Sequence, residues 1–395
     1  MTTFIYFHLR TLQVSERIYS IDSLRAIAIF FVVIAHLRPF EGFPPHGALL
    51  YFVLDTIGQF DVPFFFLTAG YFLATKLQPA DIISSVCAAA RKLGSLYIFG
   101  ILVHLTAMGV VVTVELLRNR AIMTTPAGRL LKGFTLAELV YYGNGIAVPL
   151  WFLTTLFFSI CLVALFVALR RTRYLLPVAA GIHLLGILAQ NYPMVLPITI
   201  SFPTRDALFF GFFYVALGYW VRRSDWTPDE RHSPLYFGSV CVFVALQVLE
   251  QYTVSYLLPG LTFAQGIRGT EYTFATIVLA FSLFAYALSN PTWGKSTVLP
   301  TLGEYAVGVY LLHFPVYHIL KTINSFVVPL SGLNYPATLA WQVLVTPLVY
   351  ALSLSVYLLA ARGGVVEVDG SHTPWIGSFR ARLDEFTSEM NFLTN

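Results

Sequence analysis

The stretch "IDSLRAIAIFFVVIAHLRPF", residues 21–40, places an Asp, an Arg and a His in a segment otherwise apolar enough to cross a membrane. Ionisable groups inside a bilayer are costly, so they tend to mark functional sites. If the segment is helical, Arg25 and His36 are separated by roughly three turns and about 16 Å of rise, and they share one face. Asp22 lies one turn before Arg25, at a spacing where the two side chains can pair.

The composition of the whole chain indicates a membrane protein. Of its 395 residues, 57% are hydrophobic and 11% are charged, whereas soluble domains have about 45–50% and 25%. A bilayer core of about 30 Å needs roughly 20 apolar residues per helix, and the sequence offers about ten such segments. We therefore expect an all-α, polytopic integral membrane protein. The expected spans lie near residues 20–40, 49–75, 93–116, 149–169, 174–192, 206–222, 234–257, 271–290, 299–321 and 338–361. Within the second of them, Pro63 predicts a kink.

Basic residues in the short loops predict the orientation of these spans. Their distribution favours cytoplasmic N- and C-termini, because one side of the membrane then receives most of the basic side chains. The predicted organisation is a cytoplasmic segment at 1–19, a membrane domain at 20–361 and a short cytoplasmic tail at 362–395. The cytoplasmic set comprises Arg10, Arg17, Lys76, Arg91, Lys92, the "RRTR" of residues 170–173, Arg222, Arg223, Arg231, Lys295 and Arg362. Four basic residues would lie outside, namely Arg118, Arg120, Arg129 and Lys132. The segment "RLLKGFTLAELVYYG", residues 129–143, predicts an amphipathic interfacial piece.

Charge and cysteine usage exclude other classes. The formal net charge is +4, but the basic residues lie between apolar segments, so nucleic acid is not an expected partner. The three cysteines, Cys87, Cys161 and Cys241, have no CxxC spacing and no clustered histidines. We therefore expect neither a disulfide framework nor a metal site.

The opening stretch resembles the first helix of the acyltransferase family 3 membrane proteins. The mark of this family is an Arg, ten intervening residues and a His, here Arg25 and His36. The segment from Val62, which is similar to the second helix of the family, departs from the usual pattern. The Ser that usually precedes the Gly is replaced, which leaves Thr68 and Ala69 ahead of Gly70. The later segments similar to the family, in its order, are "VPFFFLTAGYFL" from Val62, "PLWFLTTLF" from Pro149, "RDALFFGFFYVALGYWV" from Arg205 and "LGEYAVGVYLLHFPVY" from Leu302.

The resemblance implies an enzyme of the plasma membrane that moves an acyl group, usually acetyl, from cytoplasmic acyl-CoA to a hydroxyl of a cell-surface glycan or lipid-linked saccharide. Acyl-CoA is then a donor substrate, membrane lipids surround the chain, and no permanently bound cofactor is expected. Some relatives carry a C-terminal extracellular domain that receives the acyl group. Residues 362–395 are too few for one, so we expect either direct transfer or completion by a separate extracytoplasmic partner.

Chemistry independent of the resemblance suits the same residues. An imidazole has a pKa near physiological pH and can act as a general base toward a hydroxyl or as a nucleophile, so His36 is the candidate catalytic residue. The planar fork of Arg25 suits CoA phosphates or pantetheine amides. The alternative for His36 is a buried histidine that hydrogen-bonds to a neighbouring helix. The alternative for Arg25 is an anchor that pairs with Asp22. With the first and ninth helices parallel, His313 lies roughly 14 Å above Glu304 and at the depth of His36. The two histidines could divide acid and base roles, or His313 could merely bond a neighbour.

The remaining candidates are assigned more weakly. Asp61 is a candidate for binding acceptor hydroxyls, and the alternative for it is a solvated position. For Asp55 the solvated position is the favoured interpretation. Arg205 either contacts the acceptor or snorkels at the interface. Asp22 and Glu304 are expected to be structural carboxylates. Expected aromatic-belt residues are Trp151 and Phe152, expected core histidines are His104 and His183, and His318 is interpreted as an interface residue.

A different class also fits buried ionisable groups. A proton-coupled transporter or a polysaccharide export component would use them as a proton relay. The sequence favours the enzyme because the polar residues gather in the first and ninth helices, and because we find no paired broken helices in two matching halves.

Overall fold

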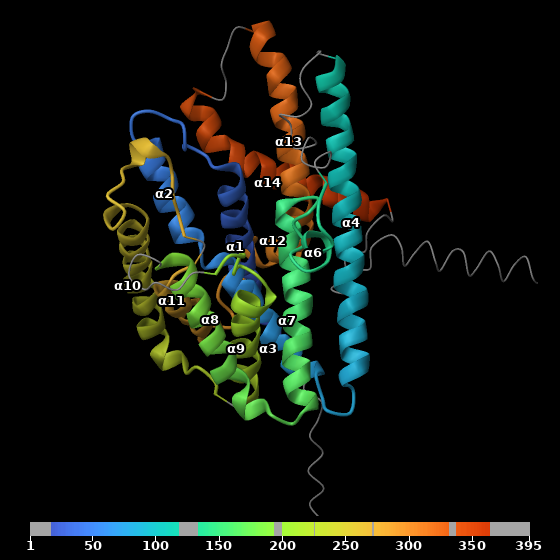
Figure 1. The fold of residues 1–395 in the computed structure, drawn as a ribbon, viewed down its shortest axis with the longest axis vertical. Coiled ribbons are helices and arrows are strands. Elements are labelled where there is room, and N and C mark those ends of the chain that lie inside the picture. The colour runs from blue at the N-terminus through green and yellow to red at the C-terminus, as the bar shows by residue number, and fades with distance from the viewer. Residues whose placement is uncertain are drawn as a thin grey trace, which may run out of the picture.

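The computed structural model describes residues 17–117, 133–192, 200–224, 226–270, 272–331 and 337–363. Every regular element within these ranges is helical, so the expected all-α class is confirmed (Figure 1). Three expectations fall outside the described residues. These are the outward basic group from Arg118 to Lys132, most of the segment 1–19, and the tail beyond residue 363.

The helices follow one another along the chain with short connections. In order, the α-helices are α1 (Tyr19–Leu37), α2 (Gly47–Gly58), α3 (Asp61–Lys76), α4 (Ile82–Leu117), α6 (Leu136–Val140), α7 (Trp151–Ala168), α8 (Leu175–Asn191), α9 (Phe212–Arg223), α10 (Ser233–Tyr252), α11 (Phe274–Ser289), α12 (Leu299–Glu304), α13 (Ala306–Ser331) and α14 (Leu339–Arg362). Two π-helical turns join them, η4 (Ala207–Gly211) and η6 (Thr253–Leu257).

Eight helical stretches in the described ranges are long and apolar enough to cross a membrane. They are α1, α2 with α3, α4, α7, α8, α10, α13 and α14, each with its short flanking turns. The other two of the ten expected spans are shorter. One is α11, with 16 residues, and the other is α9, whose 12 residues continue the π turn η4.

Three expected helices have different limits in the structure. The second span breaks at Gln59 and Phe60, ahead of Pro63, because proline has no N–H for the carbonyl four residues earlier. The expected helix 299–321 is divided at Tyr305 into α12 and α13. Helix α4 begins at Ile82, eleven residues before the expected span 93–116. Helical backbone hydrogen bonds do not depend on apolar side chains, so the helix can extend beyond the N-terminal limit of the apolar run.

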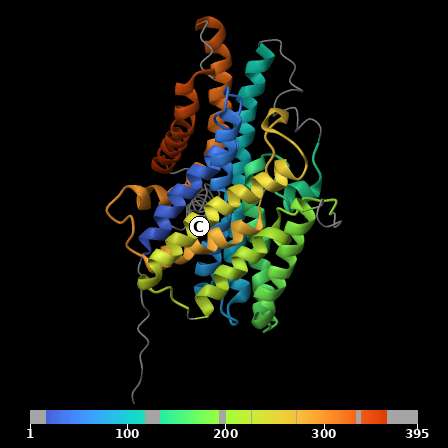
Figure 2. The same cartoon turned by 90° about the vertical axis from the view of Figure 1, so that its left-hand side faces the viewer.

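The bundle is centred on α1, which packs against α3, α12, α13 and α14 (Figures 1 and 2). The closest pair, α3 and α9, meets at glycines. A side chain at Gly70 would collide with the carbonyl of Val215, and one at Gly218 would collide with the carbonyl of Leu67. Small residues let membrane helices approach to backbone contact, so these glycines fix the pair.

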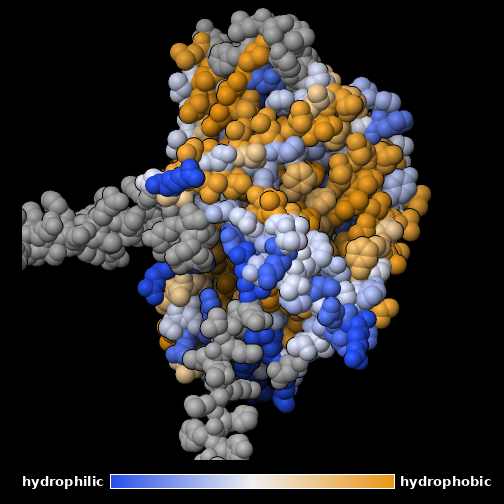
Figure 3. Space-filling model, turned by 180° about the vertical axis from the view of Figure 1, so that it is seen from behind, coloured by the Kyte–Doolittle hydropathy of each residue, from blue (hydrophilic) through white to orange (hydrophobic). Residues whose placement is uncertain are grey.

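The ends of the helices divide into two sets. The connections after α3, α7 and α9 lie together at the lower end of Figure 1, and they carry Lys76, the 170–173 "RRTR" and Arg223. These three loops therefore share a side, as their basic residues predict, whereas the identity of that side stays a prediction. From behind, apolar side chains cover most of the upper surface and hydrophilic ones gather below (Figure 3).

Candidate active site

Two cavities, each of about 310 Å³, meet at His36. Four side chains line both of them: Val32, His36, Val62 and Trp151. We call the first the apolar cavity, because its walls are mainly aliphatic and aromatic residues of α1, α3, α4, α7 and α13. We call the second the polar cavity. It lies beside α1, α2 and the start of α3, and residues 267–270 contribute to it.

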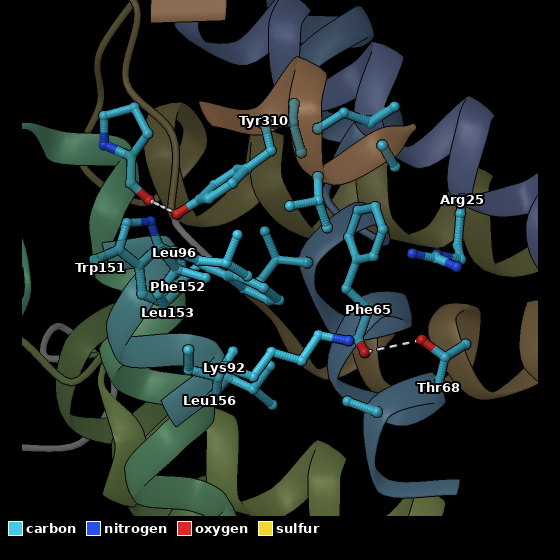
Figure 4. Close-up of a pocket in the computed structure, with 18 of the residues that line it drawn as sticks. Arg25, Phe65, Thr68, Lys92, Leu96, Trp151, Phe152, Leu153, Leu156 and Tyr310 are labelled. Atoms are coloured by element: carbon cyan, nitrogen blue, oxygen red, sulfur yellow. Dashed lines mark hydrogen bonds between the residues drawn. The ribbon is translucent and has the colours of Figure 1, made fainter. Parts of the chain in front are cut away.

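Two cations point into the apolar cavity from different helices. Arg25 extends from α1 and Lys92 from α4, and both side chains are directed at the space between them (Figure 4). The sequence places Lys92 in a cytoplasmic loop, but the structure places it on α4. A signal for this is present in the sequence, since Lys92, Leu96, Gly100 and His104 recur every four residues and so share one helix face.

Arg25 also belongs to a small ionic network at the start of α1. Its Nη1 is 3.4 Å from Oδ1 of Asp22, whose other oxygen is 2.9 Å from Nε of Arg17. Arg17 in turn lies 2.5 Å from Oε1 of Glu304 at the end of α12. Asp22 and Glu304 therefore connect α1 with α12 through Arg17, while the side chain of Arg25 remains 28% exposed and faces the cavity.

The polar cavity contains both expected carboxylates and Arg205. Asp61 is 8% exposed, and its Oδ1 accepts a 2.5 Å hydrogen bond from the backbone N–H of Val62. Asp55 accepts a 3.2 Å hydrogen bond from the Tyr51 hydroxyl, and it lines the cavity. The guanidinium of Arg205 lies 4.6 Å from the centroid of the Trp151 ring.

Trp151 differs from its expected place in an aromatic belt. It is 8% exposed and forms a wall shared by the two cavities, so it lies inside the protein. The sequence could not show this, because a tryptophan at the start of an apolar helix is equally suited to the lipid interface.

The expected meeting of the two histidines is present. The ring centroids of His36 and His313 are 5.2 Å apart. In His313, Nδ1 is 2.7 Å from the carbonyl oxygen of Tyr310, which can only accept, so this nitrogen carries the proton. The Nε2 of His313 is thus an acceptor, and it is buried without a hydrogen-bond partner among the described residues. Their roles in a reaction stay predictions.

The other buried histidines are packed differently. His183 stacks between Phe213 and Tyr272, with centroid distances of 4.6 and 5.3 Å, and this confirms it as a core residue. His104 is 2% exposed and donates from Nδ1 to the carbonyl of Gly100 at 2.7 Å. Within the described ranges, no group of three or more His, Cys, Asp or Glu side chains could hold a metal ion.

Asp206 fixes the segment that carries Arg205. One of its carboxylate oxygens accepts the backbone N–H of Phe209 at 2.8 Å and caps η4, and the other accepts the Tyr141 hydroxyl at 2.9 Å. Burial and the neighbouring Asp206 carboxylate raise the pKa of Tyr141 above its usual value. Its hydroxyl therefore remains a donor at any physiological pH. The turn that Asp206 caps, η4, is π-helical, and π-helical turns are frequent at functional sites.

His36 thus lies between a cation-bearing apolar cavity and a polar one, among helices long and apolar enough to cross a membrane. The chain belongs to acyltransferase family 3, since the model of its acyltransferase domain matches residues 18–358. The family resemblance of the sequence is thereby confirmed, and it accompanies helices that are long and apolar enough to cross a membrane.

The chain is similar to a serine/alanine racemase of Enterococcus gallinarum, with 26% identity over 310 residues, which is 74% of this chain. The match spans 40% of the relative's length. No solved structure matches the chain.

Proposed function

We propose that the protein transfers an acyl group, in the simplest case acetyl, from cytoplasmic acyl-CoA to a hydroxyl of a glycan or glycolipid. The observation that carries this proposal is the position of His36, which lines both the apolar and the polar cavity. A donor and an acceptor that enter from different cavities would meet at this ring. The racemase activity named for the relative is not part of the proposal, because the match covers 40% of that protein.

The apolar cavity suits the donor. The pantetheine arm of CoA is long and thin, and an apolar passage that ends at His36 would take it with the thioester foremost. Arg25 and Lys92 are positioned to meet phosphate or amide groups that follow the arm. Arg offers a bidentate fork and Lys a point charge, so the pair combines orientation with attraction.

The polar cavity suits a hydroxyl-rich acceptor. Its charged side chains are two arginines, Arg38 and Arg205, and two aspartates, Asp55 and Asp61, so neither sign is in excess. Carboxylates accept hydrogen bonds from sugar hydroxyls, and guanidinium groups donate to their oxygens. We therefore assign this cavity to a saccharide without a strong net charge.

Besides the acyl-CoA donor and the acceptor hydroxyl, the chemical step needs one base and no further reactant. With His36 as base, it takes the proton of the acceptor hydroxyl, whose oxygen attacks the thioester carbonyl. The C–S bond breaks, the ester C–O bond forms, and the proton passes to the CoA sulfur. With His36 as nucleophile, an acyl-imidazole precedes the ester and the overall balance is the same. His313 presents Nε2 as an acceptor beside His36. It would accept the ring N–H of His36 and so orient that ring, or it would share the proton that His36 takes from the acceptor hydroxyl.

Orientation and location follow from the same proposal. Arg25 and Lys92 lie toward the end of the bundle that carries the basic loops, so we place this end and both termini in the cytoplasm, with the protein in the plasma membrane. The acceptor would then arrive from the opposite side. A separate extracytoplasmic protein that carries the acyl group onward fits this arrangement as well as direct transfer does.

A comparison of cells with and without the gene tests the proposal. Mass spectrometry of surface glycans and lipids should show one species that is heavier by an acyl group only in cells that express the protein. Cells that express His36→Ala at an equal level provide the matched control and should lack this species. The proposal fails if the acylated species is unchanged. A changed amount of unmodified glycan outside the cell would support the transporter alternative.

A further inference from the structure

A second apolar space lies directly beside the apolar cavity. It is a groove of about 370 Å³ between α4 and α7, and the last residues of α6 cover part of it. The Tyr97 hydroxyl donates a 2.5 Å hydrogen bond to the carbonyl of Leu139, which holds α6 over the groove. Residues 90–101 of α4 and 153–158 of α7 provide the remaining walls.

Only side chains separate this groove from the apolar cavity. Leu93 of α4 and Leu153 of α7 line both spaces, so one layer of atoms forms the partition. Leu153 is 3% exposed and packs in a cluster with Leu96, Leu150 and Leu311. Leu93 is only partly buried at the edge of this cluster.

The chemistry of the groove suits a hydrocarbon chain. No charged side chain lines it, and its polar groups are already used, because the Tyr97 hydroxyl bonds Leu139 and the Thr154 hydroxyl donates to the carbonyl of Trp151 at 3.0 Å. A polar or charged ligand would therefore lose hydrogen bonds to water there without replacement. An alkyl chain would lose none.

We propose that Leu93 and Leu153 set the length of the acyl group that the donor can carry. This inference rests on the proposed function. In this proposal the acyl group of the bound donor lies against the wall that Leu93 and Leu153 form, so the added methylenes of a longer acyl group must displace this wall. Truncation of either leucine would join the two spaces, and the groove would then receive the tail of a longer acyl-CoA.

Binding of two donors to the purified full-length chain tests the proposal. The measured quantity is the ratio of the dissociation constants of octanoyl-CoA and acetyl-CoA. For the natural chain we expect acetyl-CoA to bind more tightly. In Leu153→Ala the ratio should fall about tenfold, because a few methylenes gain an apolar site. Leu93→Ala should act in the same direction, and its partly buried position makes it the milder substitution.

Two further variants separate the wall from a general loosening of the cavity. Leu156 lines the apolar cavity but not the groove, so Leu156→Ala should enlarge the cavity without lowering the ratio. Gly94 lines the groove and has open space where a side chain would lie, so Gly94→Leu should fill the groove. Combined with Leu153→Ala, it should restore the natural preference.

Each possible result of these binding measurements either supports or overturns the proposed role of Leu93 and Leu153. The proposal is wrong if the ratio is unchanged in both leucine variants while acetyl-CoA is still bound. It is also wrong if the natural chain already binds octanoyl-CoA more tightly than acetyl-CoA. An equal fall in Leu156→Ala also overturns it. If the natural chain binds neither acyl-CoA, the proposed function fails instead, so the two failures are distinguishable.

Discussion

His36 differs from the other three central histidines in what surrounds its ring. His104, His183 and His313 are almost fully buried, and each uses Nδ1 to bond a backbone carbonyl. His36 lines two cavities, and it has the second imidazole 5.2 Å away. A catalytic base must reach its substrate, and His36 alone of these four faces the space in which a substrate would lie.

Replacement of His36 should therefore affect the reaction more than the fold. We expect His36→Ala to lower the rate of acyl transfer by about 10²–10⁴, the usual contribution of a general base, or to abolish it if the residue is a nucleophile. His313→Ala should retain measurable activity, because in the proposed mechanism His313 acts through His36. The measurement is acyl transfer at equal protein level. Near-normal turnover of His36→Ala would remove this residue from the mechanism.

Arg25 and Lys92 should contribute to donor affinity rather than to chemistry. Arg25→Lys should weaken acyl-CoA binding, because an ammonium cannot replace a bidentate fork, and Arg25→Ala should weaken it further. Lys92→Ala should also weaken it. Arg91 is the matched control, since it is exposed on the same helix and does not line the cavity. Donor titration of the purified variants measures the effect.

The Arg25 prediction has a defined alternative. Arg25 is 3.4 Å from Asp22, so its role could be confined to the ionic network at the start of α1. In that case Arg25→Ala would bind acyl-CoA normally but insert or fold poorly. A topology assay beside the titration distinguishes the two results.

At the scale of elements, the contact of α3 with α9 holds the site together. Helix α3 carries Asp61 and Phe65, which lines the apolar cavity, whereas Arg205 lies two residues before η4, which continues into α9. Gly70 and Gly218 bring the two helices to backbone contact. Any side chain at these positions must push α3 away from α9, which would shift the two cavities relative to each other.

Gly70→Ala should destabilise the protein accordingly. Overpacking of a well-packed contact costs about 1–3 kcal/mol, and here the obstructing group is backbone and cannot rotate away. Gly109→Ala on α4 is the control, because nothing lies within 4 Å of its added carbon. Thermal unfolding in detergent should show a lower midpoint for Gly70→Ala alone. Equal midpoints would contradict the role of the contact.

At the scale of the whole molecule, the orientation in the membrane decides which cavity meets which substrate. The 170–173 "RRTR" connection should face the cytoplasm, and the apolar cavity with Arg25 and Lys92 should open on the same side. A cysteine in place of Arg173, in a chain freed of Cys87, Cys161 and Cys241, should react with an impermeant reagent only after the cells are opened. Labelling in intact cells would reverse the orientation and exchange the sides of donor and acceptor.

The sequence by itself determined the class and the approximate positions of most helices, and it predicted that the two main histidines lie at one depth. Long apolar runs can satisfy their backbone only as helices in a bilayer, so an all-α membrane protein was predictable from composition and length. The spacing of Arg25 and His36 on one helix is a local property, because 3.6 residues per turn fixes their common face. The same argument placed His313 at the depth of His36, and their rings are in contact distance.

Tertiary structure alone decided which side chains share a cavity. Lys92 faces Arg25 only because α4 packs beside α7 and α13, whereas the sequence indicates no more than the helix face on which Lys92 lies. Trp151, at the start of an apolar helix, is buried between the two cavities and does not face lipid. The physical reason is the same in each case. Periodicity assigns a residue to a face of its own helix, whereas a cavity depends on how several helices, distant in sequence, are packed around it.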